Sequence, residues 1–117
     1  TKANDSSYLF DPPKRGEIII FDPPYPNNPD YVKRIIAIAG DTVRIRNGMV
    51  SVNDNLLKEP YISNQGSFNM PPITIPRGEI FVLGDNRSFS EDSRSFGPIK
   101  REKVIGKVWF TIWPMKP

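Results

Sequence analysis

Residues 30–41 read DYVKRIIAIAGD, and this stretch decides most of what the sequence predicts about the fold. Tyr31 to Ile38 is an apolar, β-branched run without proline or glycine, which is typical of a buried strand. The following Ala-Gly-Asp is typical of a turn. Successive strand residues face opposite sides of a sheet, so Lys33 or Arg34 must point toward whatever the sheet covers.

A lysine on an apolar face has unusual chemistry. Desolvation penalises the ammonium form and lowers the pKa, which makes the amine a candidate base. The alternative is an edge strand in which Lys33 and Arg34 are both solvated near the strand end. This stretch alone favours the solvated interpretation, and the rest of the chain shifts the balance.

The composition limits the classes of protein and of chemistry. The 117 residues suffice for a single domain, 1–117, and 13 prolines and 8 glycines between apolar runs favour short strands joined by turns. Because there is no cysteine and no histidine, Ser-His-Asp and Cys-His catalysis are excluded and a zinc site is disfavoured. The net charge of +3 is scattered, so no nucleic-acid partner is expected. No apolar run approaches the ~20 residues of a membrane span, so the chain as given is expected to be soluble.

We expect a mostly β fold of seven to nine short antiparallel strands, coiled or barrel-like, with little or no helix. Asn47-Gly48 is the strongest hairpin signal, and Gly106 predicts a bulge. Residues 58–72 are expected to form a loop. The predicted strands are 16–21, 31–38, 40–46, 49–53, 56–57, 73–76, 80–83 and 104–113.

A second informative stretch, GDNRSFSEDSRSFG at residues 84–97, directly follows the predicted strand 80–83. It combines four serines, three acids and two arginines. Clusters of Ser, Asp and Asn are usually turns, so its composition alone allows either a hydrogen-bonded loop or a solvated one.

Taken with YVKR at 31–34, this stretch resembles the last sequence box of bacterial type I signal peptidases. The matching residues are VLGDNR, then SEDSR at 90–94, then FGPI. YVKR and the Gly40-Asp41 turn resemble the box that carries the catalytic lysine of that family, and RGEIIIF at 15–21 resembles the box before it. The three boxes occur in the family's order, and the resemblance extends from about Tyr8 to Pro114.

The resemblance implies a Ser/Lys serine endopeptidase of the extracytoplasmic face of the cell membrane, without a cofactor, that removes signal peptides from exported preproteins. It implies that Lys33 is the general base and that Ser90 orients the lysine amine. A free lysine pKa of about 10.4 would have to fall by roughly two to three units for work near neutral pH. Tyr31 and Val32 would line a shallow pocket for small side chains, and their strand would pair with an extended substrate. A structural network would comprise Arg34, Gly84, Asp85, Asn86, Asp92 and Arg94.

The nucleophile box of the family, roughly Ser-Met-x-Pro-Thr after a single N-terminal membrane anchor, has no match here. Ser6 and Ser7 are followed by Tyr-Leu-Phe and lie too close to Arg15, so neither is assigned as the nucleophile. We therefore expect a fragment of an active peptidase that is inactive by itself. Loss of the preceding segment should expose apolar surface and strand edges, so we expect the chain to self-associate or to fill its groove with its N-terminal arm.

Several alternatives remain at this point. The chain could be a natural, non-catalytic relative that acts as a binding or scaffold module at the outer face of the membrane. The self-cleaving SOS-repressor proteases share the Ser/Lys chemistry but lack the GDNR and S-x-D-S-R pattern. An unrelated β binding module would require a solvated Lys33. An oligonucleotide-binding barrel is disfavoured by the scattered basic residues.

Overall fold

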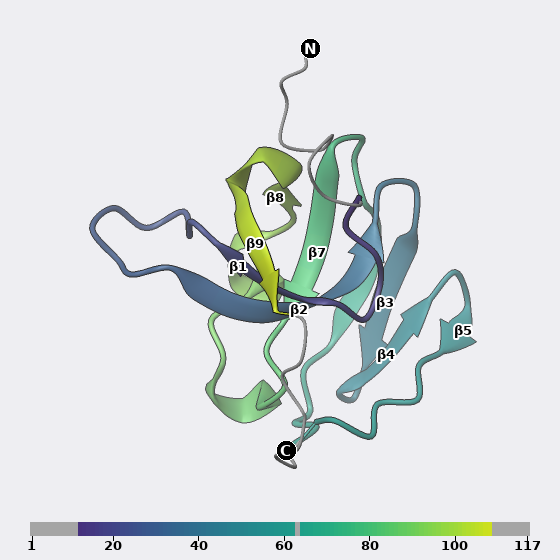
Figure 1. Cartoon of the computed structure of the whole chain (residues 1–117). Coiled ribbons are helices and arrows are strands. Elements are labelled where there is room, and N and C mark those ends of the chain that lie inside the picture. The colour runs from purple at the N-terminus through teal and green to yellow at the C-terminus, as the bar shows by residue number, and fades with distance from the viewer. Residues whose placement is uncertain (1–11, 63, 109–117) are drawn as a thin grey trace.

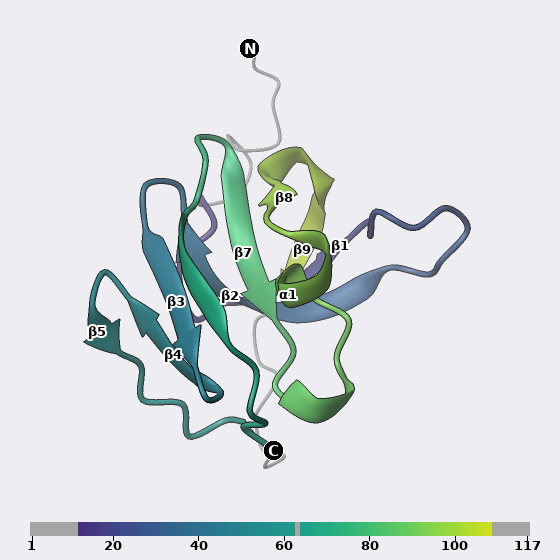
Figure 2. The same cartoon turned by 180° about the vertical axis from the view of Figure 1, so that it is seen from behind.

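Two antiparallel sheets make up the structure, a computed structural model that describes residues 12–62 and 64–108 (Figures 1 and 2). The five-stranded sheet has the order β8-β7-β2-β1-β9, and the four-stranded sheet has the order β5-β4-β3-β6. The predicted mostly β, antiparallel fold is confirmed. Residues 1–11 of the N-terminal arm, with Ser6 and Ser7, lie outside the described residues.

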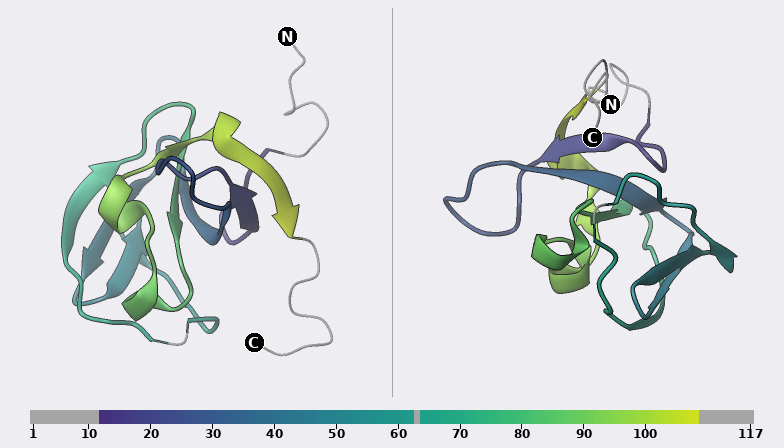
Figure 3. Two further views of the ribbon diagram at one scale, coloured as in Figure 1. Left: turned by 90° about the vertical axis from the view of Figure 1, so that its left-hand side faces the viewer. Right: turned by 90° about the horizontal axis from the view of Figure 1, so that it is seen from below.

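The first sheet is centred on β2. Its strands are β1 (Ile18–Phe21), β2 (Tyr31–Ile38), β7 (Glu79–Leu83), β8 (Ile99–Lys100) and β9 (Val104–Val108). The first four residues of β2, Tyr31 to Arg34, pair with β1, whereas the pairing of β2 with β7 begins only at Arg34. The first three residues of β2 therefore have strand pairing on one side only within the described sheet. The loop between β1 and β2 projects from the body of the molecule (Figures 1 and 3).

The second sheet is formed by β3 (Thr42–Arg46), β4 (Met49–Val52), β5 (Asn55–Leu56) and β6 (Met70–Thr74). The predicted Asn47-Gly48 hairpin joins β3 to β4, with φ values of 51° and 80° that suit a type I′ turn. β6 begins earlier than expected, within the predicted loop. Pro71 and Pro72 are tolerated there because β6 is an edge strand with an irregular register to β3.

The last part of the described chain departs most from the predicted strands. Within residues 12–62 and 64–108, helical structure is limited to single turns: α1 (Ser93–Phe96) and the 3-10 turns η2 (Arg87–Phe89) and η3 (Arg101–Lys103). Strand β8 was not predicted because two residues carry too little pattern. The bulge expected at Gly106 is confirmed, since Ile105 is an extra residue between the pairs Ile20↔Gly106 and Phe21↔Val104. Residues 109–113 of the last predicted strand lie outside the described residues.

The two faces of the first sheet bury two separate cores, because alternate side chains of β2 and β7 point to opposite sides. The core between the sheets includes Ile36, Ala37, Val43, Ile45, Val50, Val52, Ile75, Phe81 and Leu83. The core on the other face includes Ile19, Phe21, Ile35, Ile80, Val82 and Ile99. Strand β2 contributes to both, which agrees with its near-continuous apolar sequence.

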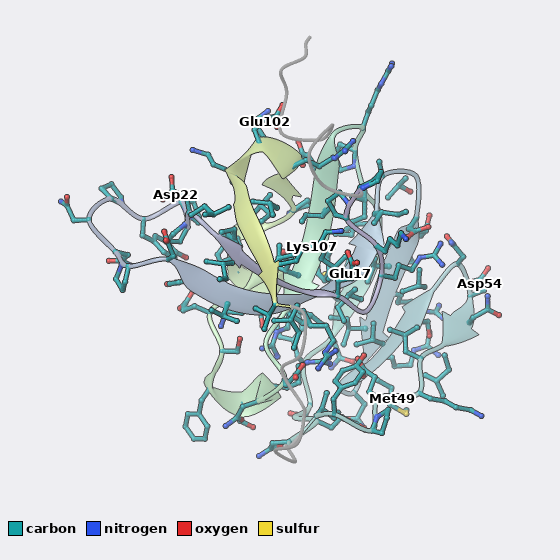
Figure 4. All side chains as sticks on the ribbon, in the orientation of Figure 1. Glu17, Asp22, Met49, Asp54, Glu102 and Lys107 are labelled. Carbon is teal, nitrogen blue, oxygen red and sulfur yellow. The ribbon has the colours of Figure 1, made fainter. Side chains whose placement is uncertain are left out.

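An ion pair ties β9 to the segment that precedes β1. Lys107 and Glu17, both labelled in Figure 4, approach to 3.3 Å, and the Lys107 side chain is only 6% exposed. Lys107 also donates to the carbonyl oxygen of Pro12. These contacts join β9 to the segment before β1 at the level of Lys33, since Lys107 and Lys33 both lie across from Ile19 of β1.

Candidate active site

Lys33 lies on the face of β2 that carries the second core. Its cross-strand neighbour on β1 is Ile19, which is fully buried, and Ile35 shares its face. The Lys33 side chain is itself half-buried, and its amine lies 5.3 Å from the centre of the Tyr31 ring. This environment matches the apolar-face interpretation of Lys33 rather than the solvated one.

The amine of Lys33 donates a hydrogen bond of 2.8 Å to Oγ of Ser90. Ser90 follows η2 in the polar stretch after β7, so this stretch must return toward β2 after β7 ends. A Cβ atom on Gly84 would overlap Oγ of Ser90 and lie 3.4 Å from Nζ of Lys33. Only glycine therefore allows Ser90 to pack directly against the backbone at this position.

Burial lowers the pKa of the Lys33 amine below its ordinary value. The carboxylates of Asp92 and Glu91 oppose this effect, whereas the nearby guanidinium of Arg94 adds to it. The shift therefore favours a neutral amine, the form in which a lysine can accept a proton.

Asp92 and Arg94 form a buried ion pair beneath Ser90. The two side chains are bonded by two contacts of 2.8 Å, and the Asp92 side chain has no exposed surface. Asp92 also accepts from the backbone N–H of Gly84 and, as the N-cap of α1, from that of Arg94. Burial alone would raise the pKa of Asp92, but these bonds outweigh it and the pKa is lowered.

Arg34 and Asp85 form a second ion pair on the other face of β2. Nε and Nη2 of Arg34 bond the two carboxylate oxygens of Asp85 at 3.0 and 2.9 Å, and Nη1 donates to the carbonyl of Gly16. The guanidinium also stacks 3.8 Å from the centre of the Tyr61 ring. The four charged residues of the expected network thus form two ion pairs, joined through the backbone at Gly84 and Asp85.

Asn86, also expected in the network, contributes through its backbone. It stands at the N-cap of η2 without a side-chain cap bond, and it forms an isolated bridge with Asn64.

Tyr31 and Val32 lie at the end of β2 that β7 does not pair. Val32 is 55% exposed and lies across from Ile20. Tyr31 packs in an aromatic cluster with Phe21, Tyr25 and Phe96, with ring centroids 5.9 to 6.4 Å apart. Tyr31 thus shares a face of β2 with Lys33 as a partly buried wall, whereas Val32 gives exposed apolar surface on the opposite face.

Sequence reasoning missed three residues around this site: Glu59, Tyr61 and Arg87. Arg87 was part of the quoted VLGDNR motif but received no role, and its position after Gly-Asp-Asn was the available signal. Glu59 and Tyr61 fall in the predicted loop 58–72, where no local pattern marks a buried charge. Their contacts depend on how the loop of the second sheet packs against the first sheet, which the sequence does not reveal.

Neither a metal site nor a membrane-spanning helix is found in the part of the chain that the structure describes. In this part, no group of three or more acidic side chains is arranged to hold a metal ion. None of the helices among these residues has the length and apolarity needed to cross a membrane.

Comparison with known proteins connects this geometry to a family. The family model described as "Signal peptidase, peptidase S26" matches residues 2–113. The chain is 39% identical to signal peptidase I of Bacillus caldolyticus, covering 97% of this chain and 69% of that protein. It is 38% identical to probable signal peptidase I-1 of Synechocystis sp., covering 92% and 59%. It is 38% identical to thylakoidal processing peptidase 1 of Arabidopsis thaliana, covering 96% and 36%.

The fold agrees with a solved structure as well. A crystal structure of a signal peptidase I from Enterococcus faecalis superposes with a TM-score of 0.69 at 33% identity, covering 83% of this chain and 97% of that one. The chain spans between 36% and 69% of the length of the three relatives named above.

Proposed function

Because the chain belongs to the signal peptidase family, peptidase S26, we propose that the complete protein is a serine endopeptidase that removes signal peptides from exported preproteins. The observation that carries the proposal is the half-buried Lys33 amine, which donates to Ser90 at 2.8 Å and has a lowered pKa. A base of this kind can work without histidine, which the sequence lacks.

In the proposed reaction the neutral amine of Lys33 is the general base. It takes the proton of a serine hydroxyl while that oxygen attacks the carbonyl carbon of the scissile peptide bond. The resulting ammonium then gives the proton to the leaving amine nitrogen as the C–N bond breaks. The lone pair of Lys33 must point at the attacking hydroxyl, and the N–H bond to Ser90 fixes the orientation of the amine.

The attacking hydroxyl is assigned to neither Ser90 nor the serines of the N-terminal arm. Ser90 is held against Gly84, which suits an orienting role better than attack on a bulky peptide. We therefore propose that residues 1–117 do not cleave preproteins by themselves, and that the nucleophilic serine is supplied by another segment of the complete protein.

The proposed substrate is an extended signal-peptide segment that adds to β2. Tyr31, Val32 and Lys33 precede the region paired with β7, so their backbone groups on that side can bond an incoming strand. Val32 is exposed and apolar, and it lies directly before the proposed base. Small substrate side chains next to the cleaved bond would contact Tyr31 and Val32.

The site's surroundings support contact with an apolar partner. Phe89, next to Ser90, is 85% exposed, and Val32 is 55% exposed. We propose that this surface lies at the outer face of the cell membrane in the complete protein, held there by an N-terminal anchor. In the isolated chain the same surface would promote self-association, which sedimentation at rising concentration would reveal.

A non-catalytic role as a binding or scaffold module is the second candidate. The start of β2, which β7 does not pair within the described sheet, is the feature that favours it, since such an edge can bind a peptide without cleaving it. This role gives no reason for a half-buried amine bonded to Ser90, which is why the peptidase ranks first.

The test uses the protein encoded by the complete reading frame and a preprotein with a signal peptide. Lys33→Ala should lower the cleavage rate by a factor of about 10³ or more, whereas Lys100→Ala, an exposed lysine on β8, should leave it unchanged. Residues 1–117 alone should give no cleavage. Cleavage by the Lys33→Ala protein at the wild-type rate would reject the peptidase role of this site.

A further inference from the structure

We infer that Glu59 and Arg87 are positioning residues for the Lys33–Ser90 pair, acting through the backbone of Gly84. The inference rests on the proposed function, because it assigns the pair a reaction that needs an exact orientation. Glu59 belongs to the connection between β5 and β6, residues 57–69, of which residue 63 is not described. A segment of the second sheet would thus set the geometry of a site on the first.

Gly84 is held through both polar groups of its backbone. Its N–H donates to Asp92 at 3.0 Å, and its carbonyl oxygen accepts from Nε of Arg87 at 2.7 Å. Since Oγ of Ser90 packs against Gly84 without room for a methyl group, a small movement of Gly84 would move Ser90. The bond between Ser90 and the amine of Lys33 would change with it.

Arg87 is in turn fixed by Glu59. The two side chains are 1% and 7% exposed, and Nη2 of Arg87 lies 2.6 Å from the Glu59 carboxylate, with a second contact of 3.3 Å from Nη1. A bidentate pair at this depth allows the guanidinium little freedom. The guanidinium therefore presents Nε to the carbonyl of Gly84 in one orientation. The backbone N–H of Arg87 also donates to the carbonyl of Asn64 in the same connection.

The β5–β6 connection reaches the site by a second route through Tyr61. The Tyr61 ring lies under the guanidinium of Arg34, the residue directly after Lys33. Arg34 bonds Asp85, the residue directly after Gly84. The connection thus contacts Arg34 directly and is linked through Arg34 to Asp85, which makes it a support for the pair rather than a distant loop.

The proposed role differs from simple fold stability in what it predicts for Lys33. Replacement of Glu59 leaves Arg87 buried without its charged partner, so the Arg87–Gly84 bond should loosen. Ser90 would then pack less closely, and water would reach the Lys33 amine. Because burial is the main cause of the lowered pKa, added hydration should raise it.

The experiment is an NMR titration of the Lys33 side chain, followed at Cε, in the folded chain of residues 1–117. We expect Glu59→Gln to raise the pKa of Lys33 by about half a unit or more relative to wild type. The matched control is Asp41→Asn, which breaks the bidentate pair between the buried Asp41 and the half-exposed Arg15 at the other end of β2. This control should leave the Lys33 titration unchanged even though it costs stability.

An unchanged Lys33 titration in folded Glu59→Gln would overturn the inference. If that variant does not fold, Arg87→Lys is titrated instead. This variant keeps the buried charge but lacks Nε, the donor to Gly84. It should raise the pKa of Lys33 in the same direction, and an unchanged value would overturn the inference. Failure of the proposed function looks different, because the complete Lys33→Ala protein would then cleave the preprotein at the wild-type rate whatever the titration of the Glu59→Gln variant shows.

Discussion

Nζ of Lys33 and Oγ of Ser90 lie 2.8 Å apart although 57 positions separate the two residues in sequence. Neither side chain reaches the other through local structure. The contact exists because β2 and β7 are neighbours in the first sheet and because Gly84, without a side chain, lets Ser90 pack against the end of β7. The site is therefore as sensitive to the packing at Gly84 as to the identity of Lys33 and Ser90.

Gly84→Ala should separate Lys33 from Ser90. The added methyl group would overlap Ser90, so the variant should lose about 1–3 kcal/mol of stability and most of the cleavage activity of the complete protein. Gly106→Ala is the matched control, since a Cβ there meets no atom within 4 Å. Urea denaturation and preprotein cleavage measure the two effects. Equal behaviour of both alanine variants would contradict the packing described at Gly84.

Lys33→Met should change the way stability depends on pH. The folded state lowers the pKa of Lys33 below its ordinary 10.5, so the unfolded chain binds the proton more tightly. The resulting cost of folding is fully present below the folded-state pKa and disappears as the pH rises toward 10.5. The methionine variant lacks this cost, so its stability advantage over wild type should shrink with rising pH in denaturation experiments. An advantage that grows with pH would show that the shift has the opposite sign.

Asp92→Asn should be among the most damaging single changes near the site. Asp92 is fully buried and bonds both Arg94 and the N–H of Gly84, so its replacement leaves a buried guanidinium without a charged partner. A loss of about 3–5 kcal/mol is expected. Asp85→Asn serves as comparison, since the Asp85 side chain is 34% exposed and its ion pair with Arg34 should contribute about 1 kcal/mol or less. Chemical denaturation of both variants tests whether Asp92→Asn loses more stability than Asp85→Asn, and an equal loss would contradict this expectation.

Asp41 should contribute to stability down to low pH. Its bonds to Arg15, together with those from the Ile38 N–H and Asn53, lower its pKa from 3.8 to about 2. A carboxyl group whose pKa is lowered by folding stabilises the fold above pH 3.8, and this contribution is lost as the pH falls toward 2. Asp41→Asn should therefore cost about 2 kcal/mol at neutral pH and progressively less below pH 3.8. A cost that stays constant through this range would show that Asp41 titrates normally.

Many strands of both sheets could be predicted because they carry strong local patterns. Tyr31 to Ile38 is a strand as expected, since its apolar run is long and free of glycine and proline. The Asn47-Gly48 hairpin followed from backbone preferences that those two residues satisfy at positive φ. By contrast, β6 was placed three residues late, because Pro71 and Pro72 argue against a strand unless its edge position is known.

The Lys33–Ser90 contact was expected from family resemblance, and no periodicity in the sequence indicates it. The buried pair of Glu59 and Arg87 was not expected, because it joins a loop of one sheet to a turn of the other. Such a pair depends on tertiary packing that brings distant polar residues together. The aromatic contact of Tyr61 with Arg34 was missed for the same reason.

The central claim is that Lys33 has the properties of a base, and its pKa tests that claim most directly. An NMR titration of the wild-type Lys33 side chain measures the value in the folded chain without requiring catalysis. The structure predicts a pKa clearly below 10.5, because burial disfavours the ammonium form. A value at or above 10.5 would contradict the account, since Lys33 would then remain charged where the proposed reaction needs a free amine.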